Sequence, residues 1–253
     1  MYQPYLDAVN ISKFRICLSQ LRMSSHSLCI ETGRWHRTTQ TPFSKRIGHV
    51  CTTLEDEYHF VIAVTKSGVL LPPQAIYVEK TDRCLPKDVF PVDWDVTCTE
   101  THWSNETSML QFIDKVVVPY VNSVRGGLPL PQCDQLVVAI FDVYKSHQSP
   151  SVISTLKENG ITPLFVPACC TDRLQPLDLT VNRSYKELLK QRFHDWYTAR
   201  LLETIDGDAD KFTVDLKTST MNPVHAQWLV STHQEVGTRR DVIRCVVERA
   251  GLL

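Results

Sequence analysis

Residues 136–142 read LVVAIFD and are followed by VYKSHQSP at 143–150, and this segment determines the architecture that we predict. Six consecutive apolar residues, Leu136–Phe141, are typical of a strand that is covered on both faces of a sheet. A short helix is predicted from Pro150 to Gly160, and a second buried strand at 162–166. Two buried strands joined through a helix indicate a parallel βαβ unit and therefore an α/β fold.

The segments before this unit predict an antiparallel meander. Residues 46–54, 58–65 and 69–79 are rich in Val, Ile, Tyr and Phe, and 27–32 is one further short strand candidate. No periodicity marks 81–103. A helix is predicted to begin at Ser104 or Asn105 and to end at Gly126, because apolar residues recur at helical spacing between them. The sheet is therefore expected to be mixed.

The remainder of the chain is predicted to be helical. A long helix is expected over 179–202, with shorter ones near 223–232 and 238–250, and DGDAD at 206–210 is the expected hinge. We therefore divide the chain into an irregular N-terminal segment (1–40), an α/β domain (41–205) and a C-terminal helical extension (206–253).

Composition excludes several classes of protein. The chain has 253 residues, a formal net charge of −1 and 43% hydrophobic residues, which is ordinary for a globular domain and excludes a disordered or wholly basic chain. Its longest apolar run is far shorter than the about 20 residues that span a membrane, and no secretory signal begins it. We expect an intracellular protein without membrane contact, whose nine cysteines are reduced.

Two carboxylates stand where an α/β sheet places its ligands. Asp142 ends the first buried strand, and Asp178 follows the second strand and precedes the long helix. Each has an ordinary alternative, since Asp142 suits a turn and Asp178 suits a helix N-cap. Together they are the oxygen ligands that a divalent cation such as Mg²⁺ or Mn²⁺ prefers. Residues 51–150 carry thirteen acidic and seven basic groups, which indicates either a solvated face or such a site.

The sequence around these two acids resembles that of a known family. AIFDVYKSH at 139–147 and the segment LFVPACCTDRLQPLDLTVNRSYKELLKQRFHDWY at 164–197 are similar to the DDE superfamily endonuclease domain, and more narrowly to the pogo/jerky-type transposases of the Tc/mariner group. The resemblance runs from about Lys45 to Trp196 and includes AVTKSGVLLPPQAIYVEKT and HWSNE upstream.

The resemblance implies an RNase H-like three-layer fold and a trio of acids that coordinates two metal ions for DNA strand cleavage and transfer. Asp142 corresponds to the second acid, His147 to the histidine that follows it in many members, and Asp178 to the third acid. It also implies a nuclear protein with DNA as its partner. His147 has the alternative of a plain surface histidine.

The first acid departs from the family pattern. The family places it on the first strand, and the nearest text is Ile30-Glu31-Thr32-Gly33, in which Ile30 takes the position of the acid. Glu31 lies one residue along a strand and so faces the opposite side unless a bulge re-aims it. We expect the chain to be an active enzyme only if the carboxylates of Glu31, Asp142 and Asp178 converge on one point.

The long helix offers a non-catalytic feature. An apolar stripe is predicted to face the core, and Arg183, Lys186 and Lys190 share another stripe that suits either DNA phosphates or solvent. Three hypotheses follow: a DDE domain that binds and ancestrally cleaves DNA, an inactive domain that only binds DNA or protein partners (including a second copy), or an unrelated RNase H-like nuclease. DNA binding is expected to be weak, because the family's N-terminal DNA-binding region is not recognisable here.

Overall fold

The computed structural model describes residues 15–21, 58–78, 81, 85–101, 103–128, 136–167, 177, 181–204 and 218–249. One six-stranded sheet has the order β4-β3-β2-β1-β5-β6. Its strands are Arg15–Leu21 (β1), Tyr58–Thr65 (β2), Gln74–Val78 (β3), Asp95–Thr99 (β4), Val137–Phe141 (β5) and Ile161–Phe165 (β6). The helices are Lys87–Val89 (η2), Glu106–Phe112 (α4), Ile113–Val117 (η3), Val118–Gly126 (α5), Pro150–Glu158 (α6), Asn182–Thr204 (α8), Thr218–Thr238 (α9) and Arg240–Arg249 (α10).

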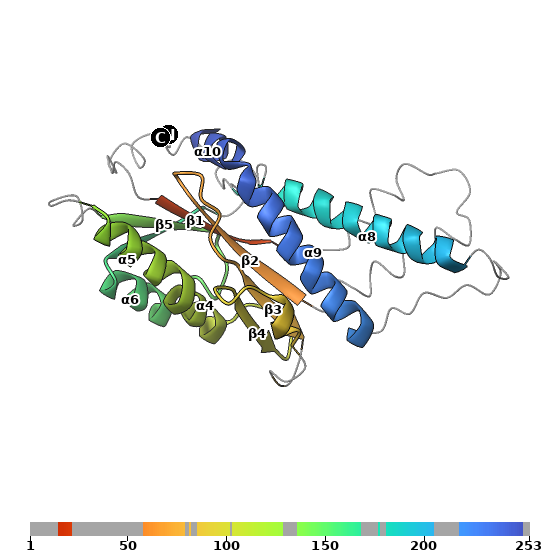
Figure 1. Cartoon of the computed structure of the whole chain (residues 1–253). Coiled ribbons are helices and arrows are strands. Elements are labelled where there is room, and N and C mark those ends of the chain that lie inside the picture. The colour runs from red at the N-terminus through yellow and green to blue at the C-terminus, as the bar shows by residue number, and fades with distance from the viewer. Residues whose placement is uncertain are drawn as a thin grey trace.

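The sheet is mixed, as expected. Strand β1 lies in its centre, antiparallel to β2 and parallel to β5 (Figure 1). Strand β3 is antiparallel to β2, β4 is parallel to β3, and β6 is parallel to β5. The predictions of β2, β5, α6 and β6 are confirmed within two residues.

Three features of the sheet differ from the prediction. Strand β1 lies in a segment where no strand was expected, and the candidates at 27–32 and 46–54 fall outside the described residues. The predicted strand 69–79 shortens to β3, because Pro72 and Pro73 offer no backbone N–H to a ladder. The segment 81–103 contains β4, whose short run DVTCT gives little periodicity.

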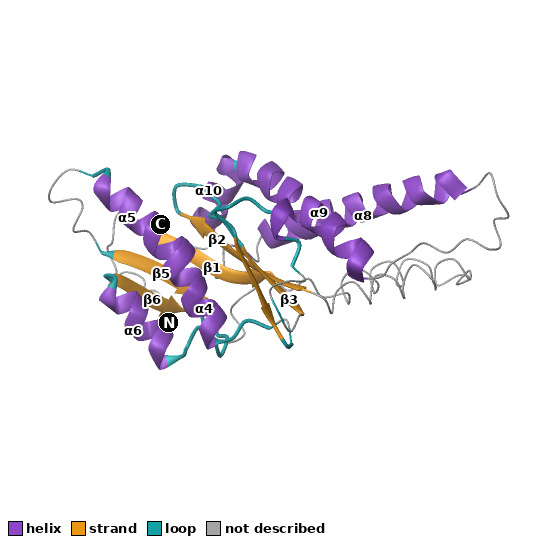
Figure 2. Ribbon diagram, turned by 60° about the horizontal axis from the view of Figure 1, so that its bottom comes forward, coloured by secondary structure: helices purple, strands orange, loops and turns teal. Residues whose placement is uncertain are grey.

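Helices cover both faces of the sheet (Figure 2), and alternate residues of β2 enter two separate cores. Val61 and Ala63 pack with α4, η3, α5 and α6, which we call the α4–α6 face. Phe60, Ile62 and Val64 pack with α8, α9 and α10, which we call the α8–α10 face. The C-terminal helices are therefore part of the same packed body as the sheet.

The helix predicted from Asn105 to Gly126 is confirmed with one irregularity. A π-turn, η3, interrupts it just before Pro119, and Val118 N–H bonds the carbonyl of Ile113 five residues earlier. Proline cannot donate the usual helical bond, so a local change of hydrogen-bond pattern at this point is the expected accommodation.

Candidate functional site

Asp142 directly follows β5, a strand whose five residues are all buried. The register of the parallel pair sets Leu18 of β1 beside Phe141 of β5. The Asp142 side chain is 23% exposed, so it lies at the carboxyl edge of the sheet with access to solvent. This is where an open α/β sheet presents groups to a ligand.

His147 holds this carboxylate. Its Nδ1 lies 2.6 Å from Asp142 Oδ1 and 3.3 Å from the backbone oxygen of the same residue. Both neighbours are acceptors, and the hydrogen bond of Nδ1 goes to the backbone oxygen, while Oδ1 is close to the ring without a hydrogen bond of its own. The ring is fully buried beside Phe141 and Tyr144, at centroid distances of 5.1 and 6.0 Å. The alternative of a plain surface histidine is wrong.

The segment between these residues turns tightly back on itself. Tyr144 N–H bonds the carbonyl of Asp142, and His147 N–H bonds the carbonyl of Tyr144. These two bonds bring residue 147 back to residue 142. The ring therefore meets the carboxylate through local backbone geometry, which a spacing of five residues permits.

The start of α4 braces this turn. Ser104 Oγ lies 3.2 Å from Ser146 Oγ, and Ser149 donates a hydrogen bond to the Glu106 carboxylate. Asn105 caps α4, with a reciprocal pair of bonds to Ser108 at 2.9 Å each. The predicted N-cap is confirmed. The bracing bonds join residues more than forty positions apart, which sequence spacing alone does not reveal.

Only part of the predicted acid trio lies in the described residues. Asp178 and Glu31 fall outside them, so the convergence of the three carboxylates stays a prediction. Within the described part of the chain, no group of three or more His, Cys, Asp or Glu side chains is placed to hold a metal ion. None of the seven residues of β1, RICLSQL, is Asp or Glu.

The predicted basic residues lie on α8. Arg183 is exposed and pairs with Glu187 at 2.9 Å, whereas Lys186 and Lys190 are half-buried. The apolar stripe of the same helix faces the core as predicted, through Tyr185, Leu189, Phe193 and Tyr197. The three cations are therefore outside the core, and their role stays a prediction.

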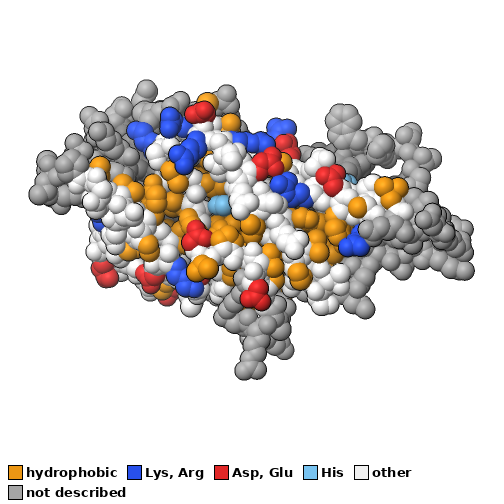
Figure 3. All heavy atoms as spheres, viewed as in Figure 1, with side chains coloured by type: hydrophobic (Ala, Val, Ile, Leu, Met, Phe, Trp, Pro, Cys, Tyr) orange, Lys and Arg blue, Asp and Glu red, His pale blue; other side chains and the backbone are white. Residues whose placement is uncertain are grey.

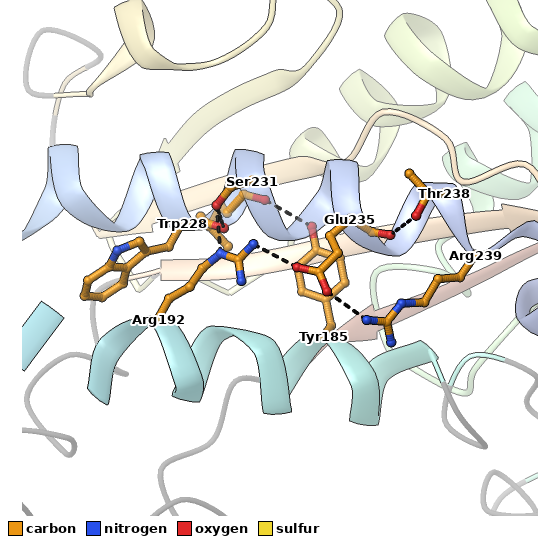
Figure 4. A network of polar contacts seen from close by, with 8 residues as sticks. Tyr185, Arg192, Trp228, Ser231, Glu235, Thr238 and Arg239 are labelled. Atoms are coloured by element: carbon orange, nitrogen blue, oxygen red, sulfur yellow. Dashed lines mark hydrogen bonds and ion pairs between the residues drawn. The ribbon is translucent and has the colours of Figure 1, made fainter. Parts of the chain in front are cut away.

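A polar network that the sequence did not indicate links α8 to α9 (Figure 4). Arg192 donates to Ser231 Oγ at 2.8 Å and to Glu235 at 3.0 Å, and Arg239 reaches the other oxygen of Glu235 at 2.7 Å. The hydrogen bond from Arg192 lowers the pKa of Glu235 below its usual value. One carboxylate of α9 thus holds two guanidinium groups, one from α8 and one from Arg239, the residue between α9 and α10.

Two histidines of α9 are buried on the α8–α10 face. His225 lies edge-on to Tyr58, and His233 lies edge-on to Trp94. Burial lowers the pKa of each imidazole to about 4. Both rings are therefore neutral at pH 7 and serve the packing of α9.

No helix among the described residues combines the length and apolar character needed to cross a membrane.

Comparison with known proteins identifies the family. The family model described as DDE superfamily endonuclease matches residues 59–238. The human "Pogo transposable element with ZNF domain" is 30% identical over 135 residues, which cover 53% of this chain and 9% of that protein. The mouse and human proteins called "Pogo transposable element with KRAB domain" are 23% and 22% identical over 152 residues, 60% of this chain and 23% of each relative. The chain thus spans less than a quarter of these relatives, and it belongs to the DDE superfamily endonucleases, with pogo-type transposable-element proteins among its relatives.

Proposed function

We propose that this chain is a transposase-derived, RNase H-like DDE domain that binds DNA in the nucleus and does not cleave it efficiently. The strand order supports the fold assignment, with β1 central between an antiparallel meander and two parallel strands. Helices on both faces of that sheet agree with a three-layer arrangement. The relatives are transposable-element proteins by name, which supports DNA as the partner.

The observation that carries the proposal is the composition of β1. The family resemblance places the first acid on the first strand, and the central strand here has no carboxylate in any of its seven positions. Continuing the β1–β5 register by one residue sets Ser19, a neutral side chain, beside Asp142. A two-metal site needs acids on both sides of the shared ligand, so loss of one acid removes much of the ligation.

We propose that Asp142 is one ligand of a weakly held cation. Asp142 offers a carboxylate at the sheet edge, with Oδ1 at 2.6 Å from His147 Nδ1. Asp178 is the proposed second ligand, and Mg²⁺ is often held by one or two carboxylates together with waters. A bound Mg²⁺ or Mn²⁺ would supply charge for phosphate binding. Among the described residues no three-acid centre is placed, and we derive no cleavage step through one.

A second function, metal-dependent strand cleavage with Glu31 as third ligand, has one observation in its favour. His147 Nδ1 lies 2.6 Å from Asp142 Oδ1, and an imidazole beside a ligating carboxylate is a common way to orient a metal ligand. A domain that has only a binding role has no need of this buried pair, although the pair also stabilises the turn at 142–147.

A plasmid nicking assay with Mn²⁺ separates the two functions. We expect wild type and Asp142→Ala to give the same low background, and Ser19→Asp to raise nicking above it. Nicking by wild type that Asp142→Ala abolishes would overturn the proposal in favour of the enzyme. A titration with Mn²⁺ is expected to show weak, millimolar binding that Asp142→Ala removes. Binding that is unchanged in that variant contradicts the assignment of Asp142.

A further inference from the structure

A group of cations surrounds the turn between β2 and the segment that leads to β3. Lys66 belongs to this turn, and Arg244 of α10 donates to the carbonyl of Ser67 at 3.3 Å. Arg240, the first residue of α10, lies against Gly68, where a Cβ atom would stand 2.6 Å from the Arg240 carbonyl. Lys and Arg side chains gather on the surface over α10 in Figure 3. We call Lys66, Arg240 and Arg244 the turn–α10 surface.

The charges of this surface are not neutralised within the described part of the chain. Lys66 and Arg240 form no ion pair with any residue that the structure describes, and Arg244 bonds a neutral carbonyl. The neighbouring Arg239 differs, because Glu235 holds it at 2.7 Å. Asp241 is an exposed acid at the start of α10. Among the described side chains, three cations without an acidic partner lie near one acid, Asp241, so this part of the surface is positive on a chain whose total charge is −1.

The surface lies at the end of the sheet opposite to Asp142. Thr65 at the end of β2 pairs with Ile16 of β1, and Ile16 pairs with Ala139 of β5. The turn after Thr65 is therefore beyond the beginning of β5, whereas Asp142 follows its end. At about 3.3 Å per residue, a strand of this length separates the two by more than about 15 Å. The cations are thus not part of the candidate acid site.

We propose that the turn–α10 surface binds the phosphate backbone of duplex DNA as a second contact, independent of base sequence and of Asp142. Guanidinium groups match phosphate oxygens in two-pronged hydrogen bonds and keep their charge at every physiological pH. Two of the three cations are arginines, carried on a helix that is fixed to the turn. The inference rests on the proposed function for the choice of DNA over another polyanion.

The test measures duplex DNA binding by fluorescence anisotropy over a range of salt concentrations. Each lost phosphate contact lowers the slope of log affinity against log salt by about one, so Lys66→Ala/Arg240→Ala is expected to lower it by about two. We expect affinity at low salt to fall by about tenfold or more, since the electrostatic contacts supply most of non-specific binding. The matched control, Lys157→Ala/Arg200→Ala, removes the same charge from exposed positions of α6 and α8 and should leave the slope unchanged.

Four other results would overturn the proposed DNA surface, and they differ in what they imply for the proposed function. Equal loss in both double variants would overturn the proposal, because net charge alone would then explain the binding. Loss only in Arg183→Ala/Lys186→Ala/Lys190→Ala would also overturn it and would leave DNA binding through α8, and with it the proposed function, intact. A double variant that loses binding to poly-glutamate and keeps DNA binding would reassign the surface to an acidic protein. The absence of DNA binding by wild type at low salt would overturn both proposals.

Discussion

The two faces of the sheet are buried by different chemistry. On the α4–α6 face the core is aliphatic and aromatic, and the buried acid beside it, Asp95, accepts bonds from Gln74, Gln111 and Lys115 at 2.5 to 2.9 Å. On the α8–α10 face, α9 brings His225 and His233 into the core, and neither Nδ1 has a hydrogen-bond partner among the described residues. The second face therefore contains two buried imidazoles whose pKa is lowered to about 4, and protonation of these imidazoles opposes the folded state.

The difference extends to function. Helix α4 on the first face braces the turn that carries Asp142 and His147. Helix α10 on the second face carries the proposed DNA surface. Cation binding at Asp142 and DNA binding at the turn–α10 surface thus depend on different cores. Substitutions that weaken one core should leave the binding at the other site measurable. The predictions that follow test this separation.

The largest expected effect is the acid sensitivity of the α8–α10 face. His225 and His233 have pKa values lowered to about 4 in the folded protein, against 6.5 when exposed. The unfolded state therefore binds more protons between these values, and stability is complete above pH 6.5 and is lost as the pH falls toward 4. Each histidine accounts for about 3 kcal/mol over this range.

Urea unfolding at several pH values measures this loss. The double variant His225→Phe/His233→Phe keeps ring contacts and removes the titration, so its stability should fall less steeply with acid than that of wild type. Parallel curves for the two proteins would show that the histidines do not cause the sensitivity.

The next largest effect is the loss of stability caused by a cavity in the α4–α6 core. Phe112 of α4 is fully buried in the α4–α6 core, and Phe112→Ala should cost about 3 to 5 kcal/mol. Phe112 lies on the opposite face of the sheet from His225 and His233, so we expect the same cost at pH 5 and at pH 7. A cost that changes between the two pH values, measured as the midpoint of urea unfolding, would break the distinction between the faces.

Removal of the Asp95 carboxylate has the third largest effect. Asp95→Ala removes one of the two acceptors of the buried Gln74 amide and leaves the half-buried Gln111 amide and the Lys115 ammonium without theirs, which should cost about 2 to 4 kcal/mol. Lys115→Met is the matched variant. Its cost should be below about 1 kcal/mol, because the lysine side chain is largely exposed and Asp95 keeps two donors. Equal costs would show that the ion pair, and not the amide network, stabilises this edge.

How far the sequence predicts the fold depends on the pattern in each element. The continuous apolar run LVVAIF and the periodic apolar stripe of the long helix are strong signals, and β5 and α8 follow them. Strand β1 was missed because RICLSQL mixes polar and apolar residues in no regular order, and its place in the sheet centre is set by pairing with β2 and β5. Neither partner is near it in sequence, so local pattern carries no information about this pairing.

The candidate site also has features that the sequence predicts and features that depend on tertiary contacts. The position of Asp142 follows from a rule about strand ends, and its pairing with His147 fits a spacing of five residues. The bracing of that turn by Ser104 and Glu106 depends on contacts between α4 and the start of α6, which only the tertiary arrangement provides. The turn–α10 surface likewise joins residues about 175 positions apart, so no sequence window contains it.

A smaller effect tests how α10 is fixed to the turn on the second face. Gly68 has a φ of +83°, and a methyl group there would meet the Arg240 carbonyl. Gly68→Ala should therefore cost about 1 to 3 kcal/mol and increase amide hydrogen exchange in α10, while α4 is unaffected. Gly126→Ala is the control, since the space around it is open and a helical Gly→Ala change stabilises by up to about 1 kcal/mol. Faster exchange in both regions would mean that the two cores are coupled.

The smallest effect concerns Glu235, whose replacement should strengthen DNA binding. In the folded protein this carboxylate holds Arg192 and Arg239, and Arg239 is adjacent to Arg240 of the turn–α10 surface. Glu235→Gln removes the negative charge with little change of shape, so Arg239 becomes free to meet a phosphate. We expect the salt slope of duplex binding to increase by about one, and stability to change by less than about 1 kcal/mol because the pairs are partly exposed. Ser231→Ala, which removes a different partner of Arg192, should leave the slope unchanged. A slope that stays constant in Glu235→Gln would place Arg239 outside the DNA contact and would confine the surface to Lys66, Arg240 and Arg244.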